Sequence, residues 1–126
     1  MIAISDNIKR SLKVSLLLVM MAPALVQANS VRIYSLTADD WARPRSGGMI
    51  PQLEPVRLAV AYWESGSDAL ILLSHPGEDS GELWASELKD WLVSLGIPAD
   101  YIRLSPGLQV EDEIQIMVGK RQELSR

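Results

Sequence analysis

Alternating and continuous runs of apolar residues predict four strands in this chain. Val31 to Leu36 (VRIYSL) and Glu113 to Val118 (EIQIMV) alternate apolar with polar residues, which is typical of strands buried on one face. Ala69 to Leu73 (ALILL) is apolar throughout, as expected of a strand that is buried on both faces and paired in parallel. Tyr101 to Leu104 is a fourth, shorter strand.

A helical repeat predicts a first helix between these strands, over Leu53 to Ser65. Val56, Val60 and Trp63 recur at helical spacing. A proline two residues after Leu53 falls in the first turn, where it is tolerated, and Gly66 is a C-terminal stop.

A second helix is predicted downstream, and its signals are the strongest in the chain. Asp79 and Glu82 have the spacing of a capping box, in which each side chain accepts a backbone hydrogen bond at the start of the helix. Gly96 and Pro98 end the helix. One continuous apolar stripe lies between these signals, made of Trp84, Leu88, Trp91, Leu92 and Leu95.

The predicted order is β-α-β-α-β-β, which indicates a single small α/β domain, an α+β sandwich with two helices packed on a mixed sheet. We expect the domain to cover residues 29–119 and a polar tail to cover residues 120–126. Residues 37–52 form a long connection that is rich in proline and glycine.

The N-terminal 28 residues have the order of a secretory signal peptide. Basic residues precede an apolar run, Val14 to Met21, and the small residues Val26 and Ala28 stand where a signal peptidase reads. The run is shorter than the roughly 20 residues that a membrane span needs. We therefore predict cleavage after Ala28 and a periplasmic protein without a membrane span; an uncleaved N-terminal anchor is the alternative.

Composition excludes several kinds of chemistry. The chain has no cysteine, so a thiol nucleophile, a disulfide and a lipid-anchored N-terminus are excluded. Its formal net charge of −4 is unsuited to nucleic acid, whose phosphates require Lys and Arg. The single histidine excludes a histidine metal cluster. Serines such as Ser74 and Ser80 lack a G-x-S-x-G setting. We predict no cofactor, no metal and no enzymatic activity.

His75 follows a predicted strand and precedes a predicted helix, which is where ligand sites of α/β proteins often lie. One interpretation is that its imidazole contacts a ligand beside Glu78 and Asp79. The other is a solvated loop histidine next to Pro76. Glu78, Asp79 and Glu82 match no cation-binding loop, and acids at the start of a helix are favoured by its dipole.

The segment DDWARPRSG in the long connection is the other candidate site. Arg43 and Arg45 can bind a carboxylate or phosphate through their guanidinium forks, with Trp41 as an apolar anchor and Ser46 beside them. Alternatively, the arginines pair with Asp39 or Asp40 and the tryptophan covers the edge of the core.

The element order and the run Leu95 to Ile102 (LGIPADYI) resemble the C-terminal OmpA-like peptidoglycan-binding domain, in which a helix ends in a similar Gly-Ile-Pro-Ala-Asp turn. In that family an Asp after the second strand and an Arg in the following helix bind diaminopimelate. The corresponding loop here is SHPGED, and the helix carries Lys89. This resemblance implies an OmpA-like topology with peptidoglycan as a ligand.

Over nearly the whole length after the signal peptide, the chain is similar to a family of small exported proteins of unknown function from bacterial integrating conjugative elements. The similarity lies in Trp41 to Gly47, Ser74 to Gly77, Gly81 to Leu92 and Leu95 to Pro98. It implies a periplasmic accessory protein of a conjugative, type IV secretion-like DNA transfer apparatus. Its partners are then other components of that apparatus, and we expect it to bind protein through the candidate residues Trp41, Arg43, Arg45, Ser46, His75 and Glu78.

Overall fold

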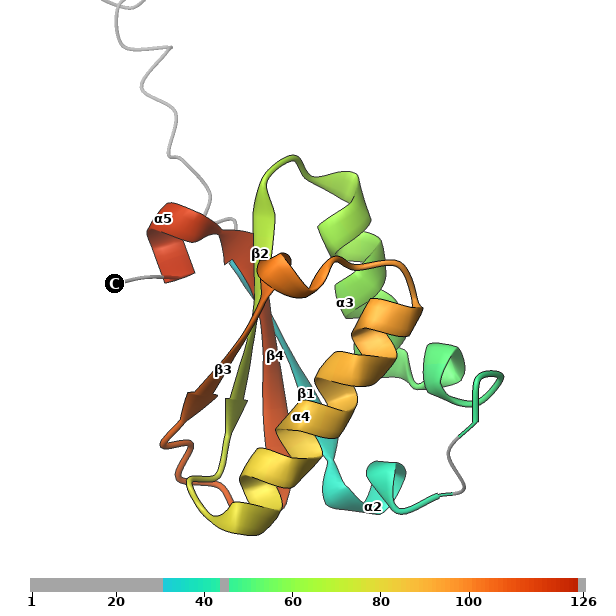
Figure 1. Cartoon of the computed structure of the whole chain (residues 1–126), viewed down its shortest axis with the longest axis vertical. Helices are drawn as coiled ribbons and strands as arrows, with labels where there is room; N and C mark the ends of the chain where they lie inside the picture. Colours follow the sequence, from blue (N-terminus) through green and yellow to red (C-terminus); the bar gives the residue numbers. More distant parts are fainter. Residues whose placement is uncertain (1–30, 44–45, 125–126) are drawn as a thin grey trace, which may run out of the picture.

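The computed structural model of the protein describes residues 31–43 and 46–124. Its strands are β1 (Arg32–Thr37), β2 (Ala69–His75), β3 (Ile102–Pro106) and β4 (Glu113–Lys120). Its longer helices are α3 (Glu54–Ser65) and α4 (Asp79–Ser94), and the short ones are α2 (Ala38–Trp41), α5 (Arg121–Leu124) and the 3₁₀ turns η1 (Ile50–Gln52) and η2 (Ala99–Tyr101). Figure 1 shows α3 and α4 beside one four-stranded sheet, which confirms the predicted fold class.

The sheet is mixed, with the strand order β1-β4-β2-β3. β2 and β3 are parallel and are joined through α4, which makes a βαβ unit. β4, the last strand in the chain, lies between β1 and β2 and is antiparallel to both. β1 and β3 are therefore the two edge strands.

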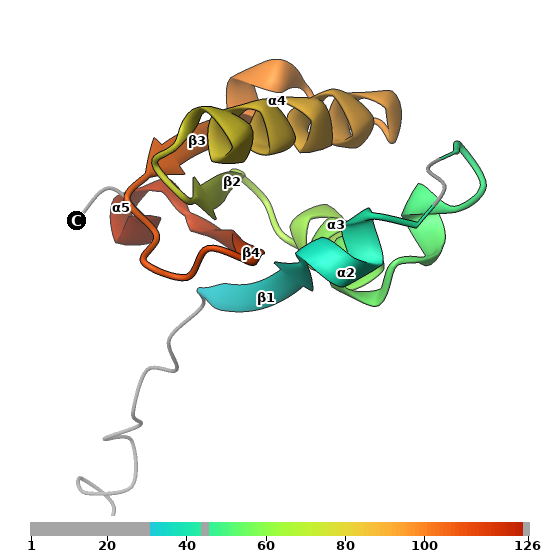
Figure 2. The ribbon, with the colours of Figure 1, turned by 90° about the horizontal axis from the view of Figure 1, so that it is seen from below.

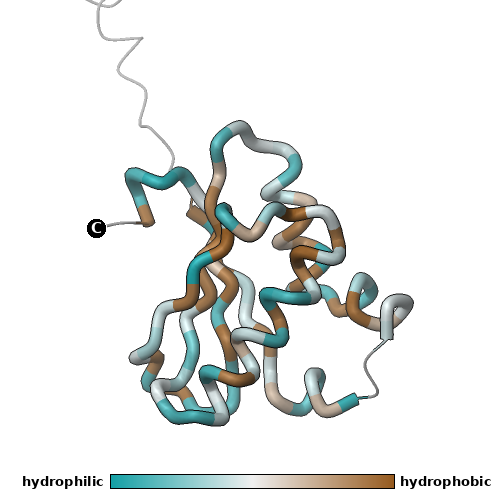
Figure 3. Tube along the Cα trace, in the orientation of Figure 1, coloured by the Kyte–Doolittle hydropathy of each residue, from teal (hydrophilic) through white to brown (hydrophobic). Residues whose placement is uncertain are grey.

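One face of the sheet forms the core with α3 and α4. Figure 2 shows α4 along β2 and β3, with α3 toward β1. Side chains from all four strands are buried on this face: Leu36, Ile71, Leu73, Ile102, Ile114, Ile116 and Val118. In Figure 3 the hydrophobic colouring runs through the strands and recurs along the helices, while many turns are hydrophilic. No helix among the described residues has the length and apolar character needed to cross a membrane.

α4 has the predicted apolar stripe. Leu88 and Leu92 are fully buried, and the remaining stripe residues are half-buried against the core. The helix ends in a Schellman motif, in which Ile97 N–H donates to Leu92 O (3.2 Å) and Gly96 N–H donates to Val93 O (3.0 Å). Gly96 has φ = +106°, a conformation that favours glycine. The predicted C-terminal stop is confirmed.

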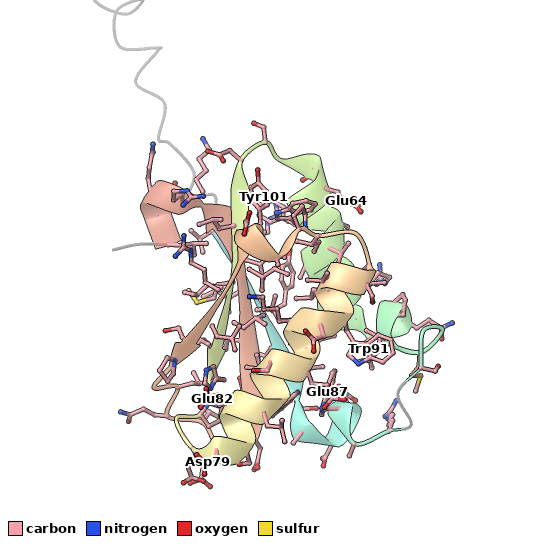
Figure 4. All side chains as sticks on the ribbon, in the orientation of Figure 1. Glu64, Asp79, Glu82, Glu87, Trp91 and Tyr101 are labelled. Atoms are coloured by element: carbon pink, nitrogen blue, oxygen red, sulfur yellow. The ribbon has the colours of Figure 1, made fainter. Side chains whose placement is uncertain are left out.

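The predicted capping box at the start of α4 is wrong. Glu78 has the extended N-cap backbone, and its carbonyl accepts from Glu82 N–H at 3.0 Å, so Asp79 is already the first helical residue. No side chain caps the helix. Asp79 lies at the exposed lower end of α4 in Figure 4, where a carboxylate still interacts favourably with the helix dipole.

Two other boundaries differ from the prediction. The connection after β1 contains α2 and η1, because Thr37 caps a helical turn that is too short to show periodicity. The expected polar tail is also ordered in part: β4 extends through Lys120, and α5 follows it. Leu124 of α5 lies with Leu70 and Leu72 around a small cavity on the sheet face away from α3 and α4. The described domain thus reaches beyond residue 119.

Candidate functional site

α2 holds the start of the arginine loop in place. Thr37 Oγ1 accepts a hydrogen bond from Asp40 N–H at 3.2 Å, which caps the helix. Asp40 and Arg43 form an ion pair with N···O 3.6 Å between side chains that are 39% and 62% exposed. The local pairing considered from the sequence is therefore present. An exposed pair of this length contributes little stability, so the Arg43 guanidinium is available to other anions.

Trp41 is a core residue and not a surface anchor. It is 7% exposed and packs on Trp84 of α4, with ring centroids 6.2 Å apart and ring planes tilted by 32°. The Nε1 atom of Trp84 is buried and has no hydrogen-bond partner among the described residues. The Trp41–Trp84 contact thus fixes α2 against α4.

Ser46 has a structural task in the turn that leads to η1. Its Oγ accepts from Met49 N–H at 3.1 Å, and its carbonyl accepts from Ile50 N–H at 3.0 Å. The chain therefore reverses at Ser46 and returns toward α3, which places Ile50 in the core. Arg45 lies outside the described residues.

Arg43 borders a groove of about 580 Å³, which we call the edge groove. It lies between β1, α2 and the first turns of α3. Its walls include Asp40 of α2 and Arg43, which follows the helix. Ile33 and Ser35 from β1 and Pro55 and Leu58 from α3 complete them. The groove therefore combines an ion pair with apolar side chains and with the outer edge of a strand.

His75 is the last residue of β2 and is only 3% exposed, so it is neither a loop histidine nor a solvated one. Its Nδ1 lies 2.8 Å from Pro76 O, and because a carbonyl can only accept, Nδ1 carries the proton. Strand pairing explains the difference from the prediction: β2 continues in register with β3 as far as His75 opposite Pro106. The imidazole is thus engaged inside the protein.

Glu78 borders a second groove of about 610 Å³, which we call the acidic groove. It lies between the first turn of α4, the start of α2 and the loop after β3. Its charged lining residues are Glu78, Glu111 and Asp112, and Trp84 contributes an apolar wall. Arg43 does not line this groove, so the structure separates the candidate residues Arg43 and Glu78 into two sites on either side of α2.

The sequence did not identify Ile33, Ser35 and Leu58 as site residues. They enter the edge groove because β1 is an edge strand and α3 packs beside it, and both facts depend on the strand order. Ile33 is 54% exposed, which the alternating pattern of its strand does not reveal. Among the described residues no three His, Cys, Asp or Glu side chains are arranged to hold a metal ion.

The chain matches no family model, no curated protein and no solved structure. Its resemblance to exported proteins of conjugative elements and to OmpA-like domains therefore stays a prediction from the sequence.

Proposed function

We propose that this protein is a non-enzymatic binding protein that acts in the periplasm as an accessory component of a conjugative, type IV secretion-like DNA transfer apparatus. Its partners in this proposal are protein components of the same apparatus. The N-terminal pattern supports export, and the family resemblance supports a role in conjugation. The geometry of the edge groove supports protein binding.

The observation that carries the proposal is the composition of the edge groove. It is about 580 Å³ in volume and is bordered by the 62% exposed Arg43 and by apolar side chains such as Leu58. A planar guanidinium can bind a partner carboxylate through two parallel hydrogen bonds. Apolar walls beside an arginine are typical of the surfaces at which proteins recognise one another.

The candidate residues other than Arg43 support binding over catalysis. His75 is buried, its Nδ1–H is engaged with Pro76 O, and no hydrogen bond from its ring to a serine is found among the described residues. Trp41 and Ser46 have packing and turn-forming roles. Arg43 and Glu78 are exposed, and Arg43 is the one of the two that borders the edge groove.

The test is a mating experiment with donor cells that carry Arg43→Ala together with Arg45→Ala. Loss of a partner carboxylate contact is worth roughly 1.5–3 kcal/mol, so we expect at least a tenfold drop in binding and a clear drop in transfer frequency. Arg103→Ala, which removes an exposed arginine from the opposite edge of the sheet, is the matched control. Unchanged transfer with a folded, normally abundant double variant eliminates this surface.

A cell-wall-binding module of OmpA-like type is the second candidate. It is favoured by the element order and by the Schellman turn at Gly96, which lies in the run that resembles that family. Against it, α4 has no arginine, and Lys89 is its only basic residue. Incubation of the purified protein with peptidoglycan sacculi distinguishes the two candidate functions. Sedimentation of the protein with the sacculi supports the cell-wall-binding module, and complete recovery of the protein in the supernatant rules it out.

A further inference from the structure

The outer edge of β1 carries unpaired backbone groups, and the register shows which ones. Ala38 N–H donates to Asp112 O at 2.8 Å, and this pair continues the register in which Leu36 lies opposite Ile114. In an antiparallel ladder, residues that exchange hydrogen bonds with the partner strand alternate with residues that face away from it. Tyr34 and Leu36 therefore bond to β4, while Ile33 and Ser35 direct their N–H and C=O groups outward.

These outward groups face open space and not another element. Ile33 and Ser35 line the edge groove, and no partner for their outward groups is found among the described residues. The other edge strand, β3, has only five residues, ends at Pro106 and carries the exposed Arg103. Short length, proline and charge are the usual protections of a sheet edge. β1 has six residues and no proline, and its one charged residue is Arg32, at its start.

We propose that β1 receives an extended segment of a partner protein, which adds to the sheet as a fifth strand. The backbone groups of Ile33 and Ser35 supply the hydrogen bonds, and the edge groove receives the side chain that points toward α3. This inference rests on the proposed function only in taking the protein to be a binding protein. It names the conformation of the partner, which the Arg43 contact alone does not specify.

The rows of side chains across the sheet define the chemistry of the incoming segment. On the face away from α3, Ile33 lies beside Met117, and the next row places Ser35 beside Gln115. An added strand extends both rows, so it needs an apolar residue at the first and a polar residue at the second. The residue between them points the other way, toward Leu58 and Pro55 in the groove, and is apolar as well.

A second copy of this chain is a weaker occupant. A six-residue strand is about 20 Å long, and pairing two such edges alone buries far less than the roughly 800 Å² per partner of a standard interface. A peptide segment can also fill the groove beside the strand, which a second copy of β1 cannot enter because its own α2 and α3 flank it.

The test uses the purified protein and a displayed library of random twelve-residue peptides as the probe. Selected peptides are expected to share the apolar-apolar-polar core in an extended, proline-free segment. Ser35→Pro removes one outward N–H, leaves the β4 ladder intact and follows Tyr34, whose extended backbone suits a following proline. We expect binding of a selected peptide to weaken at least about tenfold in Ser35→Pro. In the matched variant Ser35→Ala, which loses one cross-strand side-chain pair and no backbone hydrogen bond, we expect it to weaken by no more than about fivefold.

A second measurement does not depend on the folding of a variant. Amide hydrogen exchange of the wild-type protein is expected to be fast at Ile33 and Ser35 and slow at Tyr34 and Leu36, and the peptide should protect the first two. Peptides that bind without protecting these amides, or a selection that yields no such peptide, overturn the proposal. Dimerisation of the free protein that Ser35→Pro abolishes also overturns it, in favour of a second copy. None of these outcomes depends on DNA transfer, so failure here and failure in the mating experiment are distinguishable.

Discussion

Substitution of Gly81 by alanine is predicted to destabilise the protein, although alanine is the better helix former. Gly81 lies in the first turn of α4, where the helix meets the loop that follows β2. A Cβ at this position would lie 2.2 Å from Pro76 O and 3.0 Å from Pro76 C. Both obstacles are backbone atoms, so no side-chain rotation relieves the contact. The helix and the loop have to separate by about 1 Å.

The surrounding contacts resist that separation. Pro76 O accepts from His75 Nδ1–H at 2.8 Å, and His75 O accepts from Leu108 N–H at 3.0 Å, so the loop is held on two sides. Overpacking of this kind costs about 1–3 kcal/mol. The intrinsic preference of a helix for alanine offsets up to about 1 kcal/mol of it. The expected net effect is a loss of about 1–2 kcal/mol in the free energy of unfolding, or roughly 5–15 °C in Tm for a domain of this size.

Urea denaturation followed by tryptophan fluorescence measures this change, because Trp84 lies one turn beyond Gly81. Ser86→Ala is the matched control: the residue is exposed in the middle of the same helix, and we expect its substitution to be neutral or slightly stabilising. The sign of the change in the free energy of unfolding is the test. If Gly81→Ala is as stable as the wild type, or more stable, α4 does not press on the Pro76 carbonyl and its first turn is misplaced.

Two further predictions concern the ends of helices. Gly96→Ala is expected to lower the free energy of unfolding, measured by urea denaturation, by about 1–2 kcal/mol. The cost comes from backbone conformation alone, because φ is +106° and no atom lies within 4 Å of the added Cβ. A variant as stable as the wild type, or more stable, would contradict the Schellman motif. Thr37→Ala is expected to remove the cap of α2, which lowers stability by about 0.5–2 kcal/mol. Hydrogen exchange should become faster at Asp40 N–H and stay unchanged in α4. Equal protection of Asp40 in both proteins would show that the cap has no role.

The periodic elements could be predicted from the sequence because each is specified by its own residues. The alternation in β4 and the stripe of α4 are local patterns, and burial followed them, whereas in β1 Leu36 is buried and Ile33 is exposed although both are apolar. His75 was misplaced because Ser74 and Pro76 make its surroundings look like a loop, whereas pairing with β3 keeps the chain extended. The start of α4 was misplaced by one residue because several neighbouring polar residues can cap a helix, and the choice among them depends on tertiary contacts.

The edge groove required information that no local pattern contains. β4 is last in the chain but lies between β1 and β2, and this insertion leaves β1 at the edge. The arginine loop was identifiable as a candidate site because its charges and its proline are contiguous in the sequence. Its apolar neighbours Ile33 and Leu58 come from separate elements, and only the assembled sheet and α3 bring them to Arg43.

Because α2 lies between the two grooves, substitutions of the residues that flank it can show which groove carries the function. Ala38 lines the acidic groove, Asp40 and Arg43 line the edge groove, and Trp41 holds the helix against Trp84. Loosening α2 through Thr37→Ala therefore perturbs both grooves, whereas Arg43→Ala changes the edge groove alone. If both substitutions reduce transfer, the edge groove is required. If only the loosened helix does so, the acidic groove becomes the binding site, and a basic partner segment replaces the extended one as the ligand to seek.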